Sequence, residues 1–161
     1  MPTLKEFLAE EAEKLRGEQS DAVRKRDEWV ASIDRLLSRI KEWLHDADTA
    51  QLVSFREGRV LIREVGVGDY EAPVLFVDVG VRQVSVTPVA RVVAGGLSST
   101  GAIQILKAYG RVDMASPLEK YMLFRTQKDP EDRWVIIEDN GYRSEPFNRE
   151  TFESAFQRLL E

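Results

Sequence analysis

The hydrophobic periodicity of the chain changes near residue 50. Residues 1–50 carry apolar side chains at helical spacing, whereas residues 51–138 contain short runs with a period of two, separated by glycine and polar turns. Residues 147–161 return to helical spacing. This order predicts an α+β fold, with an N-terminal helical pair, an antiparallel sheet of about six or seven strands, and a C-terminal helix packed on the sheet.

The N-terminal pair is predicted to consist of one short and one long amphipathic helix. Thr3 and Glu6 match a capping box, so the short helix begins there, and Gly17 is expected to end it. The long helix is expected over residues 20–46, which contain neither proline nor glycine. Its apolar positions recur every seven residues, as in the column formed by Ala22, Trp29, Leu36 and Trp43.

The predicted long helix is large relative to the body that follows it. It would be about 40 Å long, whereas a compact domain of about 110 residues is roughly 35 Å across. Its apolar stripe therefore needs cover from the short helix, from the sheet or from a second copy of the chain. Intramolecular packing and an intermolecular interface remain competing interpretations. The residues assigned to the interface are Trp29, Val30, Ile33, Leu36, Leu37, Ile40, Trp43 and Leu44.

The rest of the chain, residues 50–161, is predicted to form one β-rich domain after a helical arm or hairpin over residues 1–49. Glu57 and Gly58 are interpreted as a hairpin turn between two strands. Pro88 indicates a sheet edge or a bulge, because proline cannot donate a ladder hydrogen bond. Other strands are expected at residues 73–79, 102–109, 118–126 and 133–138.

The C-terminal helix has a clear start signal. Asn148 is a suitable N-cap, and Phe147 before it can pack on Phe152 as a hydrophobic staple. Phe156, Leu159 and Leu160 continue the apolar face of this helix. The pattern predicts a helix that lies with one face on the sheet.

Composition narrows the class of function. Residues 1–50 hold nine Lys/Arg and twelve Asp/Glu, a net charge of −3, and the remainder holds fourteen and sixteen, a net charge of −2. Neither part is basic, so no nucleic-acid partner is expected. The chain has no cysteine, which excludes disulfides, thiol catalysis and thiolate metal sites. No apolar run reaches the ~18 residues of a membrane span, so a soluble, cytoplasmic protein is expected.

One glycine-rich loop is a candidate ligand site. Its amides and hydroxyls could bind a phosphate group. A phosphate-binding loop needs lysine after its last glycine at the start of a helix, whereas here a predicted strand follows Gly101. A simple strand connection is therefore the favoured interpretation. The loop residues assigned to ligand binding are Gly95, Gly96, Ser98, Ser99 and Thr100.

Several charged residues are candidate functional groups. Asp78 lies in an apolar run and could be a buried acid, although an acid on the open sheet face fits better. Arg111 and Asp113 could clamp a ligand, but an ion pair that braces a turn is favoured. His45 lies beside two aspartates at a helix end, which favours a solvated terminus over a metal site. Asp132 is expected to be a solvated charge in a turn.

These patterns lead to two hypotheses of different class. The first is a non-catalytic interaction or self-assembly module, whose N-terminal helices form a homo-oligomer, with a dimer favoured, or bind another protein. The alternative is a small-molecule-binding or enzymatic domain that uses the sheet face and the Gly95–Gly101 loop. No catalytic residue, metal or cofactor is assigned. A third and weaker option is a protein partner bound along the strand edge near Pro88.

Overall fold

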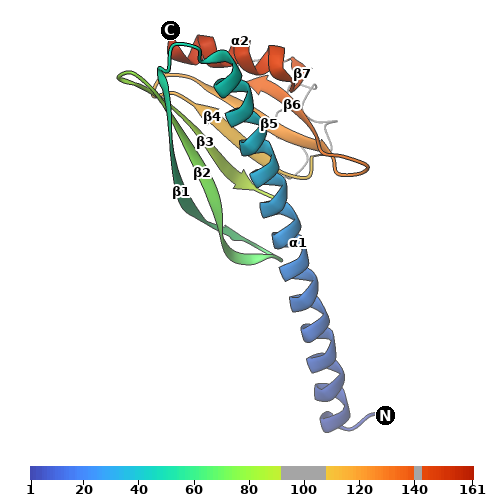
Figure 1. Ribbon diagram of the computed structural model, residues 1–161. Coiled ribbons are helices and arrows are strands. Elements are labelled where there is room, and N and C mark those ends of the chain that lie inside the picture. Colours follow the sequence, from blue (N-terminus) through green and yellow to red (C-terminus); the bar gives the residue numbers. More distant parts are fainter. Residues whose placement is uncertain (92–107, 140–142) are drawn as a thin grey trace.

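The computed structural model describes residues 1–91, 108–139 and 143–161. One long helix, α1, crosses a face of a seven-stranded antiparallel sheet, and a short helix, α2, lies at the far end of the sheet (Figure 1). The α+β architecture predicted from the sequence is therefore confirmed. The helices are α1 (Leu4–Ala47) and α2 (Arg149–Leu160), and the strands are β1 (Val53–Glu64), β2 (Gly68–Val79), β3 (Arg82–Ala90), β4 (Arg111–Ala115), β5 (Lys120–Gln127), β6 (Arg133–Glu138) and β7 (Ser144–Pro146).

The sheet of the described chain is a simple meander. Each strand pairs antiparallel with the strand that follows it, in the order β1 to β7. The register between β3 and β4 shifts at Pro88 and Ala90, so the irregularity predicted at this proline is confirmed. The strand predicted at residues 102–109 falls largely outside the described residues.

Helix α1 is one continuous helix of 44 residues, where the sequence predicted two. It begins with the predicted capping box, in which the Glu6 amide donates to Thr3 Oγ1 at 3.2 Å and the Thr3 amide donates to Glu6 Oε2 at 2.8 Å. Gly17 lies inside the helix instead of ending it. A glycine costs a helix only about 1 kcal/mol relative to alanine, and the strong helix formers around it continue the helix. At 1.5 Å per residue, α1 is about 66 Å long.

Strand β1 also runs through a predicted break. Glu57 and Gly58 pair with Leu75 and Val74 in the middle of the β1–β2 ladder, so they are not a hairpin turn. A Cβ atom at Gly58 would lie 3.3 Å from Cε2 of Phe76. Glycine therefore makes room for an aromatic ring on the neighbouring strand, which is a known reason for glycine within a strand.

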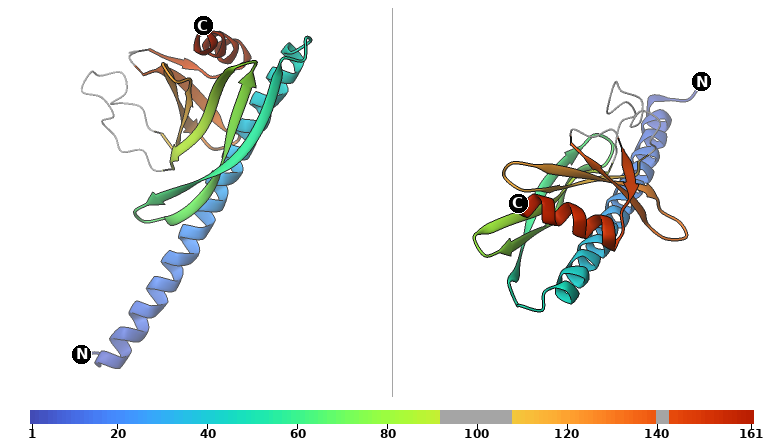
Figure 2. Two further views of the ribbon diagram at one scale, coloured as in Figure 1. Left: turned by 90° about the vertical axis from the view of Figure 1, so that its left-hand side faces the viewer. Right: turned by 90° about the horizontal axis from the view of Figure 1, so that it is seen from above.

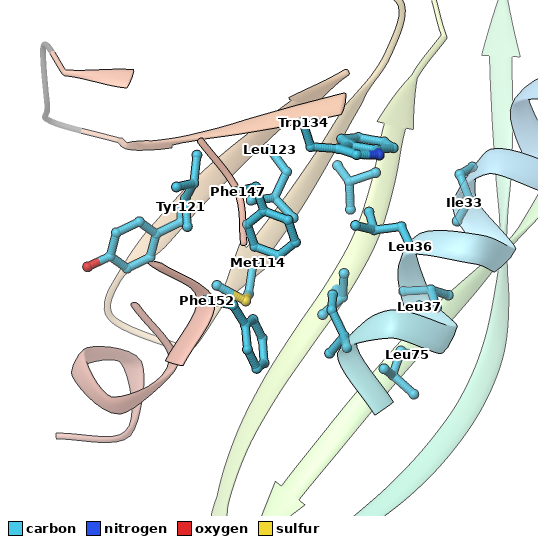
Figure 3. Packing of buried hydrophobic residues seen from close by; sticks show 14 of the residues in the cluster. Ile33, Leu36, Leu37, Leu75, Met114, Tyr121, Leu123, Trp134, Phe147 and Phe152 are labelled. Atoms are coloured by element: carbon cyan, nitrogen blue, oxygen red, sulfur yellow. The ribbon is translucent and has the colours of Figure 1, made fainter. Parts of the chain in front are cut away.

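The predicted interface stripe lies in the core of the chain itself. Figure 3 shows Ile33 and Leu36 of α1 directed toward the residues of the sheet. The same cluster includes Trp134 of β6 and Phe152 of α2. Six of the eight residues assigned to an intermolecular interface are therefore covered by their own sheet; Trp29, Ile33, Leu36, Leu37, Ile40 and Leu44 are at most 6% exposed, and Val30 and Trp43 are half-buried beside them.

Helix α2 forms as the sequence predicted. The Asn148 side chain accepts from the Thr151 amide at 3.0 Å, and Thr151 Oγ1 accepts from the Asn148 amide at 2.9 Å. Phe147 packs edge-on against Phe152 with ring centroids 6.1 Å apart. The buried face of α2 carries Phe152, Ala155, Phe156 and Leu159. Among the described residues, no helix has both the length and the apolar character needed to cross a bilayer.

Candidate functional site

The first half of α1 extends beyond the sheet, away from α2 (Figure 2, left). We call residues 4–25 the projecting segment and residues 29–44 the packed segment. A seven-residue column runs through both segments and contains Leu8, Leu15, Ala22, Trp29 and Leu36. One column of the face that packs on the sheet therefore continues along the projecting segment, whereas the column of Ile33 continues as Arg26.

The projecting segment leaves this apolar face open. Large apolar side chains there are 44% to 72% exposed, whereas those of the packed segment are almost completely covered. Isolated exposed apolar residues are ordinary on a protein surface, but a continuous apolar face marks an interaction site. The exposed residues are Leu4, Phe7, Leu8, Leu15 and Val23.

The projecting segment holds its helical form by local interactions and by its attachment. Ion pairs join Glu11 to Lys14 at 3.4 Å and Asp21 to Arg24, each three residues apart. Such pairs stabilise a helix by only about 0.2–0.5 kcal/mol each. The packed segment stabilises this helix more than the ion pairs do. Because the packed segment is already helical, no new helix has to be nucleated, and each residue of the projecting segment only extends the existing one.

Trp29 anchors α1 at the point where it meets the sheet. Its ring lies directly on Gly110: a Cβ atom at that position would be 2.9 Å from Cε3 of Trp29 and nearer still to the next ring atoms. The Trp29 and Trp134 ring centroids are 6.0 Å apart. Gly110 therefore provides the space in which the indole packs on the backbone of the sheet.

A buried ion cluster ties the same turn of α1 to strands β5 and β6. Arg125 of β5 is fully buried. Its Nη1 donates to Glu28 Oε2 at 3.0 Å, and its Nε donates to Asp132 Oδ1 at 2.9 Å. Asp132 also accepts from Ser32 Oγ and from Arg35 Nε, each at 3.0 Å. The cluster thus joins three residues of α1 to β5 and to the turn before β6.

The charges in this cluster shift each other's pKa values. Burial by itself would raise the pKa of Asp132, but hydrogen bonds from Arg125 and Arg35 outweigh it and lower that pKa below its ordinary value. The hydrogen bond from Arg125 likewise lowers the pKa of Glu28. Both carboxylates are therefore held ionised beside a buried guanidinium, which is the arrangement of a structural ion cluster.

Asp132 and Arg125 differ from what the sequence suggested. Asp132 was expected to be a solvated turn charge, yet its side chain is only 9% exposed. Arg125 was not singled out at all. The available signal was its place at the end of the apolar run Tyr121–Phe124, because a charge that follows buried strand residues on an inward-facing position needs a partner.

The two described residues assigned to ligand binding, Asp78 and Arg111, are paired within the chain. Arg56 donates to both carboxylate oxygens of Asp78, at 2.7 and 3.1 Å, and this lowers the pKa of Asp78. Arg111 donates to both oxygens of Asp113, at 2.9 and 3.1 Å. That second pair lies within β4, so it braces a strand and not the predicted turn.

Asp78 and Arg111 do not come together in one site. On strand β3, Asp78 is opposite Gln83, whereas Arg111 is opposite Ala90. Seven residues along a strand correspond to about 23 Å. The glycine-rich loop with Gly95, Gly96, Ser98, Ser99 and Thr100 lies outside the described residues.

The acidic residues around His45 also have structural partners. Asp48 caps the end of α1, and its carboxylate accepts from the Leu52 and Val53 amides at 2.8 and 2.9 Å. Asp46 lies 3.5 Å from Nη1 of Arg149. His45 is exposed in the last turn of α1, as expected for a solvated helix end.

A groove of about 910 Å³ borders the ion cluster between α1 and the β5–β6 turn. Its walls carry Arg39, Lys128 and Arg133 but also Asp129 and Glu131. These charges are close to balanced, so the groove does not select an anion or a cation. The open apolar face of the projecting segment is therefore the strongest candidate site on the described molecule.

No family model, no curated protein and no solved structure matches this chain.

Proposed function

We propose that this protein is a non-catalytic self-assembly module, in which the projecting segment of α1 pairs with the same segment of a second copy. The observation that carries the proposal is the open apolar face of that segment, collinear with the face that packs on the sheet. The β-rich body then serves as the unit that assembly brings together.

The spacing of the exposed residues supports a helix as the partner. Leu8, Leu15 and Ala22 repeat every seven residues, which is the spacing that keeps an apolar seam facing another helix. Charged residues occupy most of the remaining surface of the segment, as in a helix of which one face is covered. A second copy supplies the same seam at equal length.

The alternative of a small-molecule site on the sheet face has less support. Asp78 and Arg111, its two described charged residues, are each held in a bidentate ion pair and lie far apart along β3. A ligand would have to break these pairs before it could use the charges.

Light scattering on the full chain tests the proposal. The wild-type protein is expected to have the mass of a dimer, and Leu15→Asp is expected to be a monomer, because a carboxylate in an apolar seam must be desolvated. Ser20→Asp is the matched control: it adds the same charge about 140° around the helix from Leu15, and it should remain dimeric.

Two results would overturn the proposal. One is a wild-type protein that stays monomeric over the whole accessible concentration range. The other is a Leu15→Asp variant with the mass of the wild-type dimer, since assembly would then use a different surface. Circular dichroism and thermal unfolding of each variant check that the body is folded, because Leu15 does not touch the core.

A further inference from the structure

We infer that the two projecting segments pair antiparallel, so that the two β-rich bodies lie at opposite ends of an elongated dimer. This inference rests on the proposed self-association and specifies the orientation of the partner.

The position of the sheet excludes the parallel orientation. The apolar column of the projecting segment continues into Trp29 and Leu36, which face the chain's own sheet. Two parallel helices with their open faces together would therefore direct both sheets into the same space between the packed segments. In an antiparallel pair, each partner helix ends where the sheet begins, and each sheet lies beyond the end of the partner's helix.

A pairing centred on Leu15 brings the seven-residue columns of the two copies together. With Leu15 opposite its own copy, Leu8 lies opposite Ala22, so apolar residues meet apolar residues.

Electron paramagnetic resonance on spin-labelled full-length chains tests the orientation. The protein has no cysteine, so single substitutions give one label per chain. In the antiparallel dimer, labels at Lys5→Cys are separated by roughly 30 Å along the axis, which is twenty residues of helix. Labels at Lys14→Cys, beside the centre, serve as the control and lie at about the 8–10 Å spacing of two packed helices in either orientation.

The outcomes separate the two proposals. A long distance at position 5 with a short one at position 14 supports antiparallel pairing. Short distances at both positions mean a parallel dimer, which overturns the orientation and leaves self-assembly intact. The absence of dipolar coupling at both positions means that the chains do not pair through this segment, which overturns the proposed function itself.

Discussion

The packed and projecting segments of α1 share one helix and one apolar column but differ completely in what covers them. Leu36 and Leu15 lie in the same seven-residue column; the first is 1% exposed and the second is 54% exposed. The helix is the same secondary structure in both places, and only the presence of the sheet differs. An apolar stripe therefore shows which face of a helix needs cover, but not what provides it.

Specific contacts with the sheet define the boundary between the two segments. Trp29 fills the space over Gly110. One turn further along α1, Ser32 donates to Asp132, which is paired with Arg125. These contacts hold the packed segment at a defined angle to the sheet. The projecting segment consequently leaves the body in a defined direction, which is what pairing with a second copy requires.

The largest effect is expected from removing the charge at the centre of the ion cluster. Arg125→Met should lower the free energy of unfolding by about 3 kcal/mol, because it breaks a buried ion pair: Glu28 would lose its guanidinium partner, and the buried Asp132 carboxylate would keep only Ser32 and Arg35. Urea unfolding measures the loss. Arg35→Met is the control and should cost about 1 kcal/mol, because Arg125 still pairs with Asp132 and the Arg35 side chain is mostly exposed. Equal losses in the two variants would show that Arg125 is not the central charge.

Truncation within the shared column compares the two segments directly. Leu36→Ala should lower the free energy of unfolding by about 2–5 kcal/mol, because it leaves a cavity in the core. Leu15→Ala should change the unfolding of the monomeric body by less than about 0.5 kcal/mol and should instead weaken dimerisation. Thermal unfolding at low protein concentration separates the two effects. A large loss of body stability in Leu15→Ala would mean that the projecting segment folds back on the sheet.

Two glycines, Gly110 at the boundary and Gly17 within the projecting segment, should respond with opposite signs. Gly110→Ala should destabilise the body by about 1–3 kcal/mol, because its Cβ atom overlaps the Trp29 ring and forces repacking. Gly17→Ala should stabilise the projecting helix by about 1 kcal/mol, since nothing lies within 4 Å of the added Cβ atom. Helicity by circular dichroism and thermal unfolding of the body report the two changes. Loss of helicity in Gly17→Ala would contradict a straight, solvated helix at that position.

The smallest effect concerns pH. The native pKa values of Glu28 and Asp132 are lowered by Arg125, so their contribution to stability is complete above the ordinary carboxyl pKa of about 4. It is lost as the pH falls through the lower native values, because the unfolded state then binds more protons. The stability difference between wild type and Arg125→Met should therefore narrow between pH 7 and pH 3. A constant difference over that range would place the contribution of Arg125 in packing and not in charge.

Several elements were predictable because their signals are local. The capping box at Thr3 and the N-cap at Asn148 each depend on residues three positions apart, and both form as predicted. Likewise, alternation places Val84 and Val86 on one buried face of β3. Neighbouring residues carry all the information that such features need.

Features that depend on contacts distant in sequence were missed or misplaced. Gly17 and Gly58 have the composition of a helix end and a turn, but the first continues a helix and the second makes room for Phe76 across the ladder. Arg125 and Asp132 belong to a cluster whose other members are about 97 residues away along the chain. Burial of a charge cannot be inferred until its partners are known.

From the residues alone one learns that the N-terminal region is helical and carries an apolar face, since helical period is a property of the chain. Which part of that face is sheltered is a property of the folded molecule. The sequence predicts that the apolar residues at positions 29–44 need cover beyond the chain itself, whereas the sheet covers most of them and leaves residues 4–25 open. The reason is physical: hydrophobic burial has no direction of its own, so a stripe accepts any apolar cover, and the tertiary arrangement of sheet and helix determines where that cover ends.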